Sequence, residues 1–242
     1  MKLKLKTPPA SEPVTLAQVL TQLRLDITSP ELATGTLTIG TWYLITSTAA
    51  NAFYTGCAIG DTFKAAAATA LTASNKVREI YEGAHLNSLI VAAREYVENL
   101  CGPLITQSWY QYHDTWPYRE IILGKPRVAS VVAVKYTEYG EAAATFDSSN
   151  YSTDFVDPDK CRIVLDSDAS WPSITLEDVN PIEIEFTCGY GATWASLPEN
   201  IRLAMLLHIT NRYWNRIPDP AVEKVVEDTI TNLVINYRWW GC

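Results

Sequence analysis

The chain has 242 residues, of which 48% are hydrophobic and 19% are charged, a composition typical of a folded protein and not of a disordered one. Its net charge of −8 argues against a surface that grips nucleic-acid phosphates, because such a surface needs clustered Lys and Arg. Five scattered cysteines without a CxxC pair argue against a zinc site or a disulfide framework, and favour a reducing compartment.

The N-terminal MKLKLKTPP alternates Lys with Leu and lacks the apolar segment of a signal peptide. No run of about 18 apolar residues predicts a membrane span. We therefore expect a soluble protein that is made in the cytoplasm and contacts no membrane.

The first predicted helix covers residues 15–26. Thr15 and Gln18 have the spacing of a capping box, and apolar residues recur at i, i+3, i+4 and i+7 from Leu16. The next segment, 30–82, is rich in Thr, Ala and Gly and contains the strand-like pieces GTWYLIT, GDTF and KVREIY. Because a featureless loop of this length is unusual in a compact domain, we predict a small inserted β domain.

Aromatic residues of this insertion could form a contact surface: Trp42, Tyr43, Phe53 and Tyr54. Aromatic side chains on a β surface can stack on sugars, which makes a carbohydrate- or surface-binding module an alternative function. Packing in the core of the small β domain explains the same residues, and we favour that interpretation.

The second predicted helix covers residues 86–101 and ends at Gly102-Pro103. It is followed by LITQSWYQYHDTWP, residues 104–117, in which four aromatic rings accompany His113 and Asp114. We interpret this stretch as a scaffold strand with aromatic residues on both faces: Trp109 on one, and Tyr110, Tyr112 and Trp116 on the other.

A β-rich block follows. VASVVAVKYTEYGEAAATF predicts a hairpin with its turn at residues 138–141, and DPDK predicts a second turn at residues 157–160. In IEIEFTCGY, apolar and polar residues alternate, so the side chains of Ile182, Ile184, Phe186 and Cys188 should share one face of a strand, with Glu183 and Glu185 on the solvated face.

The third predicted helix covers residues 196–216, with Ser196 and Glu199 as a capping box. It is apolar nearly all round, so it should be central. The fourth covers residues 220–234, with Asp219 as its cap and Pro220 at its first position. One face of it is predicted to hold Val222, Val225, Val226, Ile230 and Leu233.

These elements predict an α+β fold. A helical-bundle body of about four helices has the β-rich block between helices two and three and the β insertion between helices one and two. The predicted domains are 1–29 with 83–242, the insertion 30–82, and a C-terminal tail 235–242.

Residues with catalytic chemistry do not form a recognisable motif. His208 is interpreted as an interior histidine whose hydrogen bonds are satisfied, and no second His or Cys lies at metal-ligand spacing from any histidine. His113 and Asp114 could orient a base, but no activated nucleophile accompanies them. Gly189-Tyr190-Gly191 lacks the lysine and spacing of a phosphate loop, and favours a tight turn. We predict no enzyme, no metal and no cofactor.

The C-terminal tail contains Tyr237, Arg238, Trp239 and Trp240. Two adjacent tryptophans cannot both fold back easily onto one face of their own domain. Burying one is worth on the order of 4–6 kcal/mol as an upper bound, so an exposed pair favours association with a partner. The tail is therefore predicted to dock into another protein.

Read in order, several segments resemble the head–tail connector (neck adaptor) proteins of tailed phages. They are TPPASEPVTLAQVLTQLRLD, AAREYVENLCGPLITQSWYQYHDTWP, IILGKPRVASVVAVKY, NYSTDF, SWP, IEFTCGYG, LPENIRLAMLLHITNRYWNR and LVINYRWW. The resemblance covers nearly everything except residues 30–82, and its ordered combination is more specific than any single piece.

The resemblance implies a structural virion protein of the neck. Such adaptors form a homo-oligomeric ring, usually of twelve subunits, beneath the portal of a DNA-filled head and extend the DNA channel toward the tail. It implies that helices form the ring body, that Tyr237, Arg238, Trp239 and Trp240 dock on the portal protein, and that the β part meets the next neck or tail component.

Under the same resemblance, DNA passes through the ring without specific binding, and an acidic wall would let it slide. Glu223, Glu227 and Asp228, on the predicted polar face of helix four, are candidates for that wall. A merely solvated helix face explains these three acids equally well.

Overall fold

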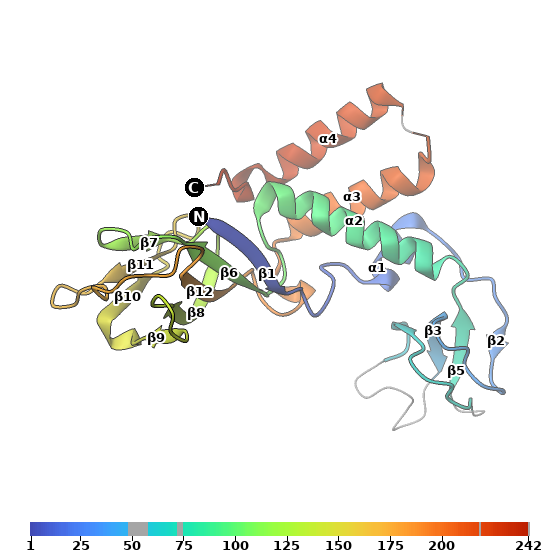
Figure 1. The fold of residues 1–242 in the computed structure, drawn as a ribbon. Coiled ribbons are helices and arrows are strands. Elements are labelled where there is room, and N and C mark those ends of the chain that lie inside the picture. The colour runs from blue at the N-terminus through green and yellow to red at the C-terminus, as the bar shows by residue number, and fades with distance from the viewer. Residues whose placement is uncertain (48–57, 72–74, 218, 242) are drawn as a thin grey trace. The chain divides into compact units, whose positions relative to one another are not determined.

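The computed structural model describes residues 1–47, 58–71, 75–217 and 219–241 (Figure 1). The chain forms two compact units, each assembled from segments far apart in the sequence. Unit 1 contains Met1–Pro13, Val97–Pro198 and Val234–Cys242, and unit 2 contains Val14–Tyr96 and Glu199–Leu233.

Unit 1 is a pair of antiparallel sheets. The larger sheet has the strand order β1-β6-β12-β8-β9, with β1 at Lys2–Thr7, β6 at Gln107–His113, β12 at Ile182–Cys188, β8 at Val128–Tyr136 and β9 at Ala144–Phe146. The smaller has the order β10-β11-β7, with β10 at Tyr151–Asp154, β11 at Arg162–Leu165 and β7 at Glu120–Ile122. Short 3-10 helices lie at Ser148–Asn150, Trp194–Ser196 and Ile235–Tyr237.

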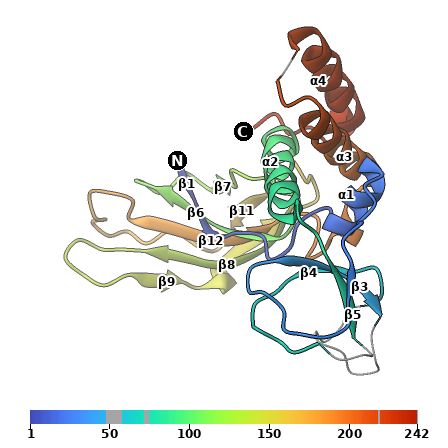
Figure 2. The same cartoon turned by 90° about the vertical axis from the view of Figure 1, so that its right-hand side faces the viewer.

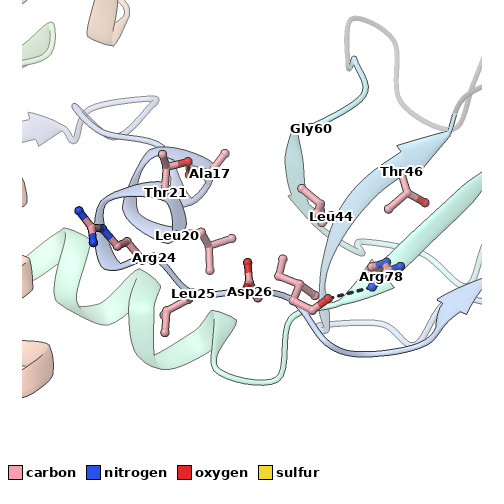
Figure 3. A pocket seen from close by; sticks show the side chains of 11 residues that line it. Ala17, Leu20, Thr21, Arg24, Leu25, Asp26, Leu44, Thr46, Gly60 and Arg78 are labelled. Carbon is pink, nitrogen blue, oxygen red and sulfur yellow. Dashed lines mark hydrogen bonds between the residues drawn. The ribbon is translucent and has the colours of Figure 1, made fainter.

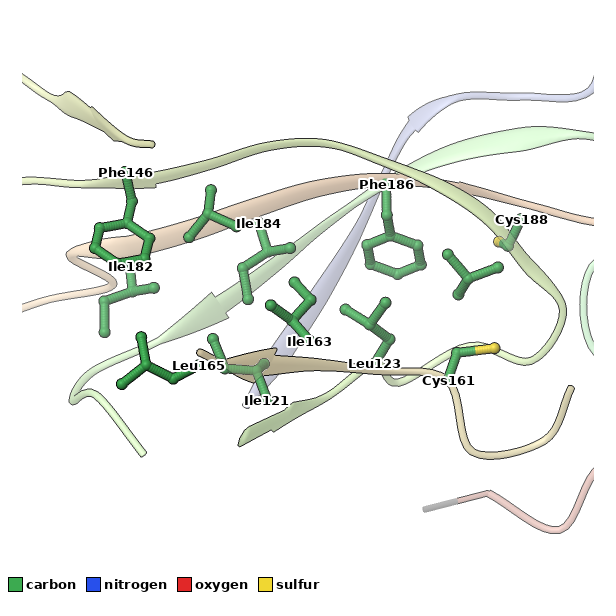
Figure 4. Packing of buried hydrophobic residues seen from close by; sticks show 12 residues of the cluster. Ile121, Leu123, Phe146, Cys161, Ile163, Leu165, Ile182, Ile184, Phe186 and Cys188 are labelled. Carbon is green, nitrogen blue, oxygen red and sulfur yellow. The ribbon is translucent and has the colours of Figure 1, made fainter. Parts of the chain in front are cut away.

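The core of unit 1 lies between these sheets. Along β12 the buried residues alternate with half-buried ones, as the alternation in IEIEFTC predicts. Ile184 and Phe186 point toward Ile163 of the smaller sheet (Figure 4). The alternation therefore positions one whole face of the larger sheet as the apolar side of a two-layer core.

Unit 2 combines helices with a separate small sheet. Its helices are α1 (Leu16–Leu23), most of α2 (Gly83–Cys101), α3 (Glu199–Trp214) and nearly all of α4 (Pro220–Val234). Figure 2 shows α3 and α4 running in opposite directions, with α1 beside α3. The sheet has the order β2-β5-β3-β4, with β2 at Glu31–Leu32, β5 at Lys76–Glu79, β3 at Trp42–Ser47 and β4 at Thr62–Lys64.

Several local predictions are confirmed. The capping box of α1 is present, with the Thr15 hydroxyl accepting from the Gln18 N–H and the Gln18 side chain accepting from the Thr15 N–H. The Asp219 carboxylate accepts from the Ala221 N–H at 2.9 Å and so caps α4. Four α-helices and three antiparallel sheets in the described part of the chain confirm the α+β class. A division at 30–82 into a separate domain stays a prediction.

The predicted start of the third helix is wrong. Ser196 lies in a 3-10 helix, and α3 begins at Glu199. Leu197 is extended, with φ −83° and ψ 141°, because the ring of Pro198 disfavours helical angles in the residue before it. Ser196 therefore cannot cap α3.

The predicted buried face of α4 is wrong in part. Val226, Ile230 and Leu233 are buried or half-buried, but Val222 and Val225 are exposed. Part of the apolar face of α4 is therefore left uncovered by the described residues of unit 2.

Trp116 is also placed differently from its prediction. The strand ends at His113, so Trp116 does not continue the face of Tyr110 and Tyr112. It stacks on Trp171 with ring centroids 4.5 Å apart and packs against the core between the two sheets, as Trp109 does.

Candidate functional site

The predicted docking tail is held on unit 1 by Arg127. This residue has a left-handed backbone, φ +55°, which is uncommon for a residue other than glycine. Its guanidinium donates to the carbonyl oxygen of Cys101 at 2.6 Å and to that of Tyr237 at 2.9 Å. One side chain therefore joins the C-terminal end of α2 to the tail.

The ring of Tyr190 lies under the same guanidinium, whose central carbon is 4.4 Å from the ring centroid. Tyr190 belongs to the turn Gly189–Gly191, and a Cβ at Gly189 would lie 2.8 Å from the backbone of Ile105. The chain bends at Gly189 and Tyr190, and glycine is required at position 189 for close backbone packing. Burial raises the pKa of Tyr190 to about 12.

Trp239 folds back onto unit 1. Its backbone N–H donates to the carbonyl oxygen of Leu100 at 2.9 Å. The Lys125 ammonium lies 5.7 Å from the Trp239 ring and 4.2 Å from the ring of Trp109, so it stands between two indoles. Burial lowers the pKa of Lys125.

Trp240 does not fold back. It is 78% exposed, and among the described residues its ring contacts the guanidinium of its neighbour Arg238, whose central carbon lies 4.2 Å from the ring centroid. The predicted docking residues therefore differ in how they are held. The Tyr237 and Trp239 backbones are anchored, and Trp240 presents a free indole.

The three acids of α4 also differ from one another. Glu223 forms an ion pair with Arg212, with an N–O distance of 2.7 Å. Glu227 and Asp228 are exposed and form no ion pair with the described residues. Only these two acids add uncompensated negative charge to α4.

His113 and Asp114 do not form a catalytic pair. The Nε2 atom of His113 lies 2.8 Å from the side-chain nitrogen of Gln111, whereas the Asp114 carboxylate accepts from the Asn180 N–H at 3.0 Å. Burial is the main reason that the pKa of His113 lies below its usual value. The pair is part of the scaffold at the end of β6.

His208 is an interior residue, as predicted, but its hydrogen bonds are not all satisfied. Its ring stacks on Tyr96 at 4.6 Å, and its Nδ1 atom has no partner among the described residues. Burial lowers its pKa, and the nearby Arg212 lowers it further. Stacking, not hydrogen bonding, holds this neutral ring.

The aromatic residues of the insertion do not form the proposed contact surface as a set. Tyr43 is 2% exposed, stacks on Phe63 at 5.8 Å and accepts from the Thr38 N–H. It is therefore a core residue of the small sheet and not a surface aromatic. Trp42 is half-buried. Phe53 and Tyr54 lie outside the described residues.

A hollow of about 540 Å³ lies between α1 and the small sheet within unit 2 (Figure 3). Its charged side chains are Arg24, Asp26 and Arg78, and Arg78 donates to the carbonyl oxygens of Ile27 and Ser29. None of the described residues that line it is a His or a Cys.

The described residues contain no group of three or more His, Cys, Asp and Glu side chains that could hold a metal ion. None of their helices is both long enough and apolar enough to cross a bilayer.

Sequence comparison identifies no relative: no family model matches this chain, and no curated protein matches it. Its fold is similar to chains in solved particles. One, from the neck of an empty GTA particle computed with C6 symmetry, has a TM-score of 0.64 at 19% identity and covers 99% of this chain and 96% of that one. Another, from the virion of a native gene transfer agent (GTA) particle, has a TM-score of 0.62 at 18% identity with the same coverage. A third, from the neck of a native GTA particle computed with C12 symmetry, has a TM-score of 0.53 at 23% identity and covers 64% of this chain and 82% of that one.

Proposed function

We propose that this chain is a structural neck protein, one subunit of a ring that joins a DNA-filled head to a tail and extends the DNA channel. The observation that carries the proposal is the fold similarity to a GTA neck chain over 99% of this chain and 96% of that one. The ordered motifs in the sequence support it separately, because they cover the helices, the β block and the tail.

The partners in this proposal are further copies of the chain, the portal protein, and the next neck or tail component. The C6 and C12 symmetries applied to the neighbours' particles are compatible with a ring of twelve. The protein has no catalytic role in this proposal, and its place is the neck of the virion, after synthesis in the host cytoplasm.

Within this function, we assign the portal contact to Trp240 and Arg238. The anchored backbones of Tyr237 and Trp239 fix where the exposed indole lies. A pre-positioned aromatic anchor loses little conformational entropy when it enters a pocket on a partner, and tryptophan is enriched among residues that dominate binding energy.

The charge distribution supports passage of DNA without specific binding. The net charge is −8, and a negative wall repels phosphates. Since Glu223 is paired with Arg212, the acid of α4 that we assign to the wall is Glu227.

A point substitution tests the docking role more cleanly than removal of the tail, since removal would also leave Arg127 without Tyr237. We expect Trp240→Ala to weaken binding to the purified portal at least tenfold while leaving the melting temperature unchanged. Binding is measured by biolayer interferometry, with Tyr118→Ala as the control because Tyr118 is an exposed aromatic residue far along the chain.

The outcomes separate the two levels of the proposal. Binding by Trp240→Ala as tight as that of the unsubstituted chain would remove the docking role of Trp240. If the unsubstituted chain itself fails to bind the portal, the neck function is wrong.

A further inference from the structure

α3 has an apolar side that the described residues of unit 2 leave exposed. Its buried side consists of Ile201, Ala204, Met205, His208, Ile209 and Tyr213. On the opposite side, Leu203 and Trp214 are 46% and 61% exposed. A helix that is apolar all round is normally buried all round, so the exposed side of α3 indicates a missing partner.

α4 presents a second uncovered apolar surface. Val222 and Val225 are 44% and 65% exposed and lie one helical turn apart, with Thr229 one turn further. Valine lowers helix propensity, so an exposed valine pair adds nothing to an isolated helix. We call Val222, Val225 and Thr229 the α4 ridge.

A shallow groove of about 540 Å³ lies between α1 and α3. It is lined by Ala17, Gln18, Thr21, Gln22, Arg24 and Leu206. Leu206 is one turn from the exposed Leu203, so the groove continues into the uncovered side of α3. Two of its lining residues, Ala17 and Thr21, have short side chains. We call it the α1–α3 groove.

The two surfaces carry opposite charges at their borders. Arg24 lines the groove, is exposed and has no ion pair with the described residues. Asp228 follows Val225 by three residues, so it borders the ridge, and it is likewise exposed and unpaired within the described chain. Such complementarity fixes the register of two surfaces more than it adds affinity.

We propose that the α4 ridge of one copy seats in the α1–α3 groove of the next copy, with Asp228 facing Arg24. The inference rests on the proposed function and specifies how its ring is made. Ridge and groove are different surfaces, so their contact is head-to-tail and can repeat around a ring, whereas contact of identical surfaces would stop at two copies. Asp228 then belongs to the contact between subunits and not to the channel wall.

Cross-linking between differently substituted chains tests the pairing directly. Chains with Val225→Cys are mixed with chains with Leu206→Cys, both also carrying Cys57→Ser and Cys242→Ser, and are assembled with the portal. Cys101, Cys161 and Cys188 are buried, so they should not react with a bismaleimide. We expect a cross-linked dimer in the mixture and none in either preparation alone. A control mixture pairs Leu206→Cys with Val156→Cys, an exposed loop valine outside the ridge.

Absence of the cross-link in the mixture would overturn the pairing. Efficient cross-linking of Val225→Cys chains to one another would also overturn it, because that product requires identical surfaces to meet.

Charge reversal gives a second measurement, the fraction of protein in rings by mass photometry. Asp228→Arg and Arg24→Asp should each lower that fraction severalfold, and the double variant should restore it. Val225→Arg should abolish rings while leaving the circular dichroism spectrum unchanged, and Val156→Arg should leave rings intact. Unaltered rings from Val225→Arg would refute this contact yet leave the neck function standing. If the unsubstituted chain neither forms rings nor binds the portal, the neck function fails, and this contact fails with it.

Discussion

Arg127 has a left-handed backbone, a conformation that is unfavourable for residues with a side chain. The contacts of its side chain explain why an arginine occupies this position. The guanidinium satisfies two carbonyl oxygens, of Cys101 and of Tyr237, the latter 110 residues away. A glycine at position 127 would relieve the backbone strain but would lose both hydrogen bonds. The strain is therefore tolerated because the side chain connects α2 to the C-terminal tail.

We expect Arg127→Ala to lower the free energy of unfolding by about 2–4 kcal/mol, because two charge-assisted hydrogen bonds are lost and two carbonyl groups are left without donors. The measurement is urea unfolding followed by tryptophan fluorescence. Arg24→Ala is the matched control, since Arg24 has nearly the same backbone, φ +54°, but an exposed side chain without an ion pair to the described residues. Equal stability of the two variants would show that the Arg127 side chain does not hold the tail.

The buried cysteines make stability sensitive to alkaline pH. Burial raises the pKa of Cys188 from 9.0 to about 12 and that of Cys101 to about 11. Above pH 9 the unfolded chain therefore releases protons that the folded chain keeps, so their contribution is full below pH 9 and is lost as the pH rises toward 12.

We expect the unfolding free energy to fall by about 1.5 kcal/mol for each of these thiols, about 3 kcal/mol together, between pH 9 and pH 10.5. Urea midpoints at a series of pH values measure it. Cys188→Ala will be less stable at every pH, but its stability should decline less steeply with pH. A decline as steep as that of the unsubstituted chain would rule out Cys188 as a cause.

At the scale of elements, Gln111 connects the two sheets of unit 1. It is fully buried in β6, where its side-chain oxygen accepts from the Gly124 N–H and its nitrogen donates to the Ile122 carbonyl oxygen, each at 2.8 Å. Ile122 is the last residue of β7, so one amide joins strands of different sheets.

Gln111→Leu should cost about 2–4 kcal/mol of unfolding free energy, because the buried Gly124 N–H and the partly buried Ile122 carbonyl oxygen lose their partner. Tyr112→Phe, on the half-buried opposite face, removes only the bond to Glu183 and should cost about 1 kcal/mol or less. Both are read from chemical denaturation. Comparable losses from the two substitutions would contradict the bridging role.

The sequence predicted elements whose signal is local. The alternation in residues 182–188, the turn at 138–141 and the Asp219-Pro220 helix start all formed as expected, because each depends on neighbours in the chain. β1 was not predicted, although MKLKLKTPP has the period of a strand. The partners of its lysines are distant in the sequence and are brought close only by folding. One of them is Glu185, whose carboxylate lies 2.6 Å from the Lys6 ammonium.

At the scale of the molecule, the candidate site was predictable only in outline. The tail and its tryptophans were recognisable from sequence, but the anchors Arg127 and Lys125 carry no local signal because their contacts with the tail join residues more than a hundred positions apart. Likewise, the pattern of α4 could not separate the valines that face its own unit from those that face outward, since both lie at helical spacing. Such distinctions depend on tertiary packing.

The interleaving of the two units has a consequence for synthesis. β1 is synthesised long before β6, the strand with which it pairs. Similarly, α1 is synthesised long before α3, because α3 follows the whole β block in the sequence. Unit 2 cannot be completed until its last helix has emerged, and unit 1 still needs residues 234–242, which Arg127 holds. Nascent chains therefore have unpaired strands and uncovered helices during much of translation, and we expect chaperones to bind them. For the same reason, we expect two separately expressed halves of the chain to fold poorly.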